Sequence, residues 1–128
     1  MTSLLFDMPL IPPSVNHYAK HTRTGKHYRT AEASAFKAAI GIYARGAVES
    51  KNGFYVFITV TLGEGQRGDI DNFPKLVLDG LADAGVFRDK KGKRLSDGHV
   101  SELWVKVDRD TRPKTGSTFI GVTAIERL

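Results

Sequence analysis

Two aspartates separated by one residue, Asp69 and Asp71, lie in the hexapeptide RGDIDN at residues 67–72. On an extended chain, residues i and i+2 point to the same side, so both carboxylates can face one point. Two carboxylates directed at one point repel each other unless a divalent cation or a proton lies between them. Magnesium is commonly bound through one or two carboxylates together with water and substrate phosphate. The spacing therefore predicts a magnesium site that acts on a phosphate ester.

Lys75 and Asp79 follow these acids at helical spacing. Residues four apart share one helix face, so the Lys75 ammonium can reach a metal-bound phosphate and offset its developing charge. Asp79 can hold Lys75 by an ion pair or add a metal contact. A structural alternative stays open, because an Asp-x-Asp pair before a helix often serves as an N-cap and dipole partner. Lys75 and Asp79 would then form an ordinary surface ion pair.

The composition narrows the classes of protein that fit. The 128 residues suit one domain, and the absence of cysteine excludes disulfides, thiol catalysis and cysteine-bound zinc. No stretch approaches the ~20 apolar residues of a membrane span, and residues 1–9 lack the basic region of a signal peptide. We therefore expect a cytoplasmic protein with no membrane partner. The net charge of +5 and the pI of about 9.6 favour a polyanionic partner.

The apolar patterns predict the elements that position the acids. Helical spacing over residues 30–46 has Thr30 as its cap and Phe36, Ile40, Tyr43 and Ala47 as its apolar face. A second helix begins at Asp71 or Asn72 as cap, tolerates Pro74 in its first turn, and ends at Gly85. Strands are expected at residues 3–10 (an edge strand), 54–62, 100–107 and 118–125, with a basic loop or hairpin at 14–29 and a loop at 87–98. We predict one α+β domain over residues 1–128, a mixed four-stranded sheet with two helices packed against it, in the order β-α-β-α-β-β.

The N-terminal basic segment is a candidate nucleic-acid surface. Its cations alternate with aromatic residues, which suits phosphate contact together with stacking on unpaired bases. The candidates are Tyr18, Lys20, Arg23, Lys26 and Arg29. His17 and His21 have helical spacing, but no acid or cysteine joins them and Pro12 and Pro13 precede them, so a zinc site is not expected there.

In combination, these motifs resemble the signature of the RusA-type Holliday junction resolvases, and the resemblance spans nearly the whole chain. The central motif comprises Arg67, Asp69, Ile70, Asp71, Asn72, Lys75, Asp79 and Leu81, followed by Gly85, Val86, Asp97 and Val100. The opening motif comprises Pro12, Pro13, Ser14, Val15, Asn16 and Tyr18, and the entry to the first helix comprises Arg29, Thr30 and Glu32.

The resemblance implies a homodimeric, magnesium-dependent endonuclease that makes paired nicks across four-way DNA junctions, in recombination and repair. Manganese is expected to substitute for magnesium. By position, Asp69, Asp71 and Asp97 would be the metal ligands and Lys75 the catalytic lysine. Asn72 would be a supporting hydrogen-bonding residue, and Asn16 and Arg67 would bind DNA.

The chain departs from the family pattern at two places. The third acid of the family usually follows the Gly-Val turn within a few residues, whereas Asp97 lies beyond a longer basic segment, residues 88–94. Asp89 has the more usual spacing, but Asp97 is favoured because strand entry fixes geometry better than loop length does. The inserted cations either grip a DNA arm or are simply solvated. At the second place, Gly68 stands where the family often has a basic residue, which predicts one weaker phosphate contact.

Further expectations concern the assembly of the protein and two alternative functions. Trp104 is expected in the core or in a dimer face, and Phe73 and Leu76 are candidates for the same face. A symmetric dimer would place one active site on each of two opposed strands of the junction. Two alternatives remain: a nuclease for flaps or forks, and a non-catalytic junction-binding protein whose acids only cap a helix.

Overall fold

The computed structural model describes residues 1–13, 19–21, 27–29 and 31–126, and for 19–21 and 27–29 it describes the backbone alone. A mixed four-stranded sheet forms one layer, in the order β1 (Ser3–Met8), β8 (Ser117–Ala124), β5 (Phe54–Thr61) and β7 (Val100–Asp108). The β1–β8 and β8–β5 pairs are antiparallel, whereas β5 and β7 are parallel. β1 therefore lies at a sheet edge, as predicted.

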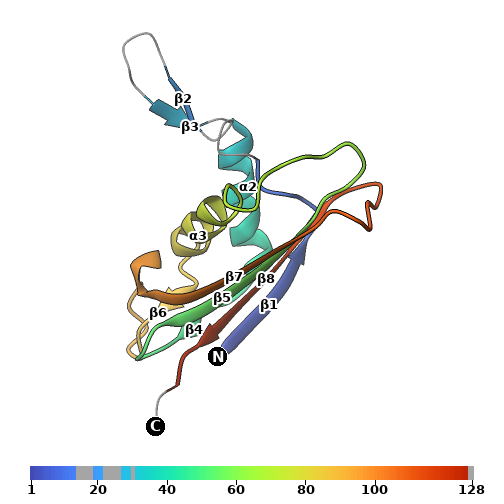
Figure 1. The fold of residues 1–128 in the computed structure, drawn as a ribbon. Coiled ribbons are helices and arrows are strands. Elements are labelled where there is room, and N and C mark those ends of the chain that lie inside the picture. The colour runs from blue at the N-terminus through green and yellow to red at the C-terminus, as the bar shows by residue number, and fades with distance from the viewer. Residues whose placement is uncertain (14–18, 22–26, 30, 127–128) are drawn as a thin grey trace.

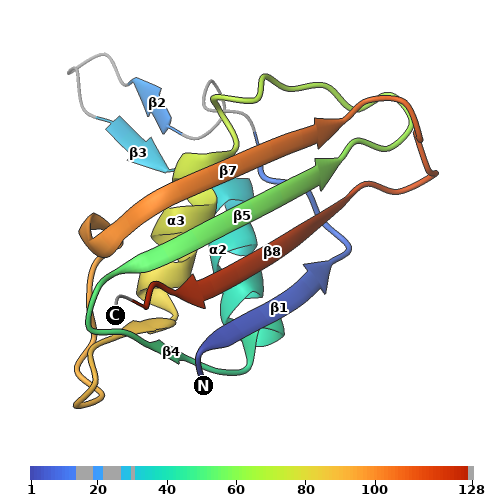
Figure 2. The same cartoon turned by 60° about the horizontal axis from the view of Figure 1, so that its bottom comes forward.

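Two helices cover one face of this sheet and leave the other face open (Figures 1 and 2). They are α2 (Ala31–Ala44) and α3 (Pro74–Asp83). The strict alternation of buried and half-buried residues along β5 turns Phe54, Val56, Ile58 and Val60 toward the helices. The predicted α+β architecture, with a mixed four-stranded sheet and two helices packed against it, is confirmed.

The helices approach each other closely where Gly80 meets Ile40. A Cβ at Gly80 would lie 2.5 Å from the Ile40 Cδ1 atom, so a glycine permits this contact. Phe36 and Ile40 are buried as predicted, but the extension of the apolar face to Tyr43 and Ala47 is wrong. The helix ends at Ala44, and Arg45 takes a left-handed φ of 50°, so Tyr43 faces solvent and Ala47 lies outside the helix.

Several short elements complete the fold. β4 (Val48–Glu49) pairs in parallel with β6 (Phe87–Arg88), and η1 (Asp97–His99) leads into β7. The expected loop at 87–98 is thus wrong at both ends. Phe87 is fully buried, with its ring centroid 4.9 Å from that of Phe54, so its backbone joins a small sheet.

The backbone at 19–21 and 27–29 forms an antiparallel hairpin of β2 (Ala19–His21) and β3 (His27–Arg29). The hairpin alternative for the basic segment is therefore confirmed in the part of that segment that is described.

Among the residues that the structure describes, no helix is long and apolar enough to cross a membrane.

Candidate active site

The two central aspartates lie in a turn rather than on extended chain. The backbone N–H of Asn72 donates to the carbonyl oxygen of Asp69 at 3.0 Å, which closes the turn. The expected extended backbone at Asp69 and Asp71 is therefore wrong, and the convergence of their carboxylates on one metal ion stays a prediction. Both residues are exposed, and among the described residues neither carboxylate makes a hydrogen bond or an ion pair.

The helix that follows is not capped by these acids. Its N-cap is Phe73, which has helical backbone angles and makes no side-chain cap hydrogen bond, with Pro74 next to it. The prediction that Asp71 or Asn72 caps the helix is wrong, because the turn ends at Asn72 and the buried Phe73 takes the cap position. The acids thus have no capping role that would explain their presence.

Gly68 and Phe73 fix the entry to this turn. An ideal Cβ at Gly68 would lie 2.2 Å from the Phe73 Cζ atom, and Phe73 is fully buried. The Phe73 ring therefore occupies the space that a larger residue 68 would need. This contact gives a physical reason for a glycine at the position where the family often has a basic residue.

Two arginines from the β7–β8 connection hold the segment before the turn. Arg109 Nη2 donates to the carbonyl oxygen of Gly68 at 2.9 Å. Arg112 Nη1 donates to the carbonyl oxygens of Gln66 at 2.6 Å and of Gly63 at 3.1 Å. Neither arginine was singled out from the sequence, because their partners are backbone carbonyls more than 40 residues away.

Asp108 in turn shapes the connection that carries these arginines. Its carboxylate accepts hydrogen bonds from the hydroxyl and backbone of Thr111 and from the backbone N–H of Asp110. The side-chain bond from Thr111, followed by the two backbone bonds, lowers the pKa of Asp108 from 3.8 to about 2. The turn is thus fixed by a carboxylate that stays ionised at neutral pH.

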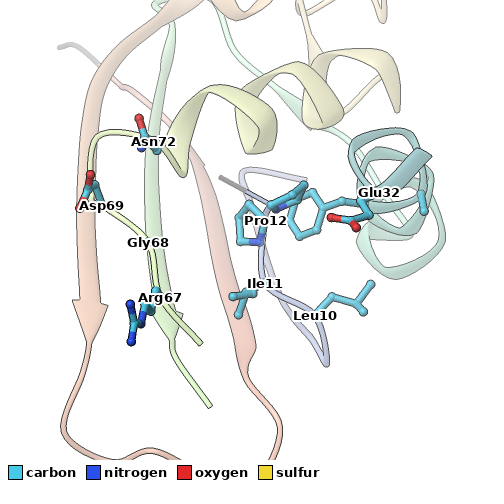
Figure 3. A pocket seen from close by; sticks show the side chains of 11 residues that line it. Leu10, Ile11, Pro12, Glu32, Arg67, Gly68, Asp69 and Asn72 are labelled. Carbon is cyan, nitrogen blue, oxygen red and sulfur yellow. The ribbon is translucent and has the colours of Figure 1, made fainter. Parts of the chain in front are cut away.

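A pocket of about 660 Å³ opens beside Asp69. Its apolar wall comes from the chain after β1 and from the start of α2, and consists of Leu10, Ile11, Pro12, Pro13, Ala35 and Phe36. The other residues that line the pocket are Glu32, Arg67, Gly68, Asp69 and Asn72. Figure 3 shows Arg67, Asp69 and Asn72 on one side and Glu32 on the other, with Ile11 and Pro12 between them.

Glu32 is a residue of this pocket that the sequence analysis did not assign to the site. It lies in the first turn of α2, and its side chain points from the helix toward Pro12 (Figure 3). The sequence pattern assigns it only to the helix entry.

Leu10, on the apolar side of the pocket, is tied to the sheet. The buried Thr118 hydroxyl donates to the Leu10 carbonyl oxygen at 2.7 Å.

Lys75 lies one turn into α3 from the acids. Its Nζ is 3.9 Å from Asp79 Oδ2, a long ion pair in which the lysine side chain is 65% exposed. The ion pair predicted from the i, i+4 spacing is therefore present. Its length and exposure leave the ammonium able to move to a phosphate.

The candidate third acids differ in how they are held. Asp89 Oδ1 accepts the backbone N–H groups of Lys91 and Lys93, and these bonds, with that from Lys93 the strongest, lower its pKa. Asp97 is half-buried in η1, which lies against α3. Within the described chain, no three acidic or histidine side chains are close enough to hold a metal ion together. The joint site of Asp69, Asp71 and Asp97 stays a prediction.

Part of the basic segment at residues 88–94 has a structural role. The Arg88 guanidinium donates to the carbonyl oxygens of Gly85 at 3.0 Å and Gly92 at 2.7 Å, so Arg88 braces its own loop. Lys90, Lys91 and Lys93 remain exposed.

The predicted DNA-binding residues fall into three groups. Arg67 is exposed at the pocket. Lys20 lies in β2 and Arg29 lies in β3, where only the backbone is described. The remaining candidates lie outside the described residues, and they are Asn16, Tyr18, Arg23 and Lys26.

The open face of the sheet carries a cluster of large apolar side chains. Leu5, Trp104 and Phe119 are exposed by 58%, 49% and 36%, and Phe57 and Tyr55 lie between them. The strand registers place all five on the side away from the helices. We call these five residues the open-face cluster.

Two expectations about the apolar residues are corrected by this arrangement. Trp104 does not belong to the core, because its position in β7 turns it to the open face. Phe73 and Leu76 are fully or almost fully buried inside the domain, so they cannot form a dimer face.

No protein-family model matches this chain, and no curated protein matches it. The likeness to RusA-type resolvases therefore depends on the motif residues.

Proposed function

We propose that this protein is a metal-dependent endonuclease that resolves Holliday junctions by paired nicks. The observation that carries the proposal is the pair of exposed carboxylates, Asp69 and Asp71, in one hydrogen-bonded turn beside a pocket that Asp69 lines. Neither acid caps a helix or pairs with a cation among the described residues. Two carboxylates two residues apart that have no structural partner can share a divalent cation, which favours a metal-binding role.

The donor set of the turn suits magnesium. Asp69 and Asp71 offer carboxylate oxygens and Asn72 offers an amide oxygen, and magnesium prefers oxygen ligands. Two carboxylates are enough when water and phosphate complete the shell, so the turn fits the ion without a third acid. A bound magnesium ion would supply charge stabilisation for the phosphate and a more acidic water.

The other residues of the site bind and orient the DNA. Arg67 presents an exposed guanidinium at the pocket, where it can hold a phosphate oxygen. Lys75 exchanges its long ion pair with Asp79 for the phosphate that gains charge during cleavage. The Arg109 bond to Gly68 keeps the turn in place while the DNA is bound. For the third acid we retain Asp97, because Asp89 is already occupied by its own loop.

Two-fold symmetry of the junction calls for a dimer, and the open-face cluster is its proposed interface. Exposed apolar patches of this kind commonly mark protein–protein contacts. The strand registers align one row across the sheet, and it consists of Leu5, Gly121, Phe57 and Trp104. In the proposed dimer the open faces of two copies stack on each other, and the two-fold axis lies between the two sheets, parallel to this row. This arrangement would bring Trp104 against the partner's Trp104. The same axis would place Glu102 opposite the partner copy's Lys106, because these residues flank Trp104 on the same face.

The dimer is tested by measuring mass in solution by light scattering. Trp104→Glu should give a monomer, because it buries an unpaired charge against the partner's apolar side chains. Ile42→Glu is the matched control, since Ile42 is another exposed apolar residue, 65% exposed against 49% for Trp104, and lies on α2 away from the open face. Equal masses for both variants and the wild type would contradict this interface.

The substrate is tested with labelled DNA of one sequence, presented as a four-way junction, a fork, a flap and a linear duplex. We expect symmetric nicking of the junction with magnesium or manganese, no nicking with chelator, and little on linear duplex. Preferential cutting of forks or flaps would move the assignment to that substrate class.

A second candidate is a non-catalytic junction-binding protein, which the net charge of +5 favours without any metal site. Tight junction binding without any product, unchanged by chelator, would establish it instead.

A further inference from the structure

The pocket beside Asp69 is larger than a single phosphate group needs. Its volume of about 660 Å³ falls within the roughly 300–1,000 Å³ typical of sites for small organic ligands. Arg67 and Asp69 lie on one side of the pocket, Glu32 lies on the other, and apolar residues lie between them. A ligand that fits combines an apolar part with polar groups, and its anionic group would lie at Arg67.

We propose that this pocket takes one unpaired nucleobase of the branched DNA, and that Glu32 accepts a hydrogen bond from its exocyclic amino group. The inference rests on the proposed function, since it places the base next to the phosphate held at Asp69. Bases at a branch point have lost part of their stacking, so moving one out of the helix costs less than it does in a duplex. Ile11, Pro12 and Phe36 offer the apolar surface on which such a base can lie.

The position of Glu32 determines which bases are favoured. Its carboxylate lies across the pocket from Asp69, and no group of three acids close enough to share a metal ion forms there or elsewhere in the described chain. A carboxylate only accepts hydrogen bonds, and carboxylates read amino groups on base edges. Adenine, cytosine and guanine carry such a group, whereas thymine does not. Thymine offers only its N3–H, which lies between two carbonyl oxygens that repel a carboxylate. The structure therefore assigns to Glu32 a selection against thymine at the nucleotide that enters the pocket.

Ala35 and Ala38 provide a matched pair of variants. Both are exposed alanines of α2, but Ala35 lines this pocket and Ala38 does not. Ala35→Phe should fill the pocket without disturbing the core or the acids. Ala38→Phe adds the same side chain elsewhere on the helix.

The first measurement is binding without cleavage. Junctions carrying 2-aminopurine near the branch point are mixed with protein in calcium, and the fluorescence of that base is followed, since it rises when the base leaves its stack. We expect a rise of several-fold with wild type and Ala38→Phe, and none with Ala35→Phe at saturating protein. An equal rise with Ala35→Phe, or no rise with bound wild type, would overturn the inference.

The second measurement is cleavage of junctions that differ only in the base beside the nick. Wild type should cut those with adenine, cytosine or guanine roughly tenfold faster than those with thymine, the scale of one hydrogen bond to a charged group. Glu32→Ala should cut all four at one rate. If wild type cuts all four equally and the 2-aminopurine signal is flat, the pocket proposal fails while the nuclease proposal stands. If no branched DNA is cut, the nuclease proposal fails, and the fluorescence arm alone decides the pocket.

Discussion

Gly68→Ala is expected to destabilise the protein, because it forces Phe73 away from the turn that carries the acids. The new Cβ would lie 2.2 Å from Phe73 Cζ and 2.8 Å from Cε1, and the ring is fully buried. Overpacking of this kind costs about 1–3 kcal/mol. Gly68 does not have a positive φ, so alanine adds no backbone strain and recovers about 0.4–1 kcal/mol through the unfolded chain. The expected net loss is about 1–2 kcal/mol.

The assay is urea unfolding of Gly68→Ala, Phe73→Leu and the double variant. Leucine frees the space that the alanine needs, so the double variant should be more stable than the sum of the single losses predicts, by at least about 0.5 kcal/mol. Gly41→Ala is the control, because its Cβ would meet only the Ala84 Cβ at 4.0 Å, and it should gain about 0.5–1 kcal/mol in its helix. Additive losses, or a Gly68→Ala protein as stable as wild type, would refute the argument.

Three other changes test separate contacts. Arg109→Met, which removes the bond to the Gly68 carbonyl, should lower junction cleavage about tenfold or more by displacing the turn, with a stability loss of about 1 kcal/mol or less in urea unfolding. Asp108→Asn should be less stable than wild type at neutral pH. Because the folded-state pKa of Asp108 is lowered, the difference in the free energy of unfolding is fully present above about pH 3.8 and disappears as the pH falls toward about 2. Unfolding midpoints of both proteins, measured across this pH range, test this expectation. Gly80→Ala should lower the thermal stability despite the better helix propensity of alanine, because its Cβ would lie 2.5 Å from Ile40 Cδ1. Ile40→Val removes this Cδ1 atom, so the double variant should recover part of the loss in thermal unfolding.

Much of the fold could be predicted from periodicity alone. The four sheet strands and both helices are dictated by apolar patterns of 2.0 and 3.6 residues, and residues such as Phe36 and Ile40 are buried as expected. The failures arise where tertiary contacts decide. Phe73 displaces the acids from the cap because the core binds its ring, and Phe87 forms a strand because it packs on Phe54.

The candidate site was only partly accessible from the sequence. Local spacing predicted the Lys75–Asp79 ion pair, because these residues lie one helical turn apart, but it placed Asp69 and Asp71 on extended chain where the structure has a turn. Glu32 and Arg109 reach the site from distant segments of the chain. A local sequence pattern cannot predict that Arg109 binds the Gly68 carbonyl oxygen or that Glu32 lines the pocket. Whether Asp97 joins the metal site is likewise a question of long-range geometry.

The most direct test of the central claim is cleavage of a labelled four-way junction by Asp71→Asn, with Asp110→Asn as the matched control. Asp110 is an exposed aspartate in the turn after β7, outside the pocket. We expect wild type and Asp110→Asn to nick the junction symmetrically with magnesium and not with chelator, and we expect Asp71→Asn to bind the junction but leave it intact. Cleavage by Asp71→Asn at the wild-type rate would contradict a metal-dependent nuclease site at this turn.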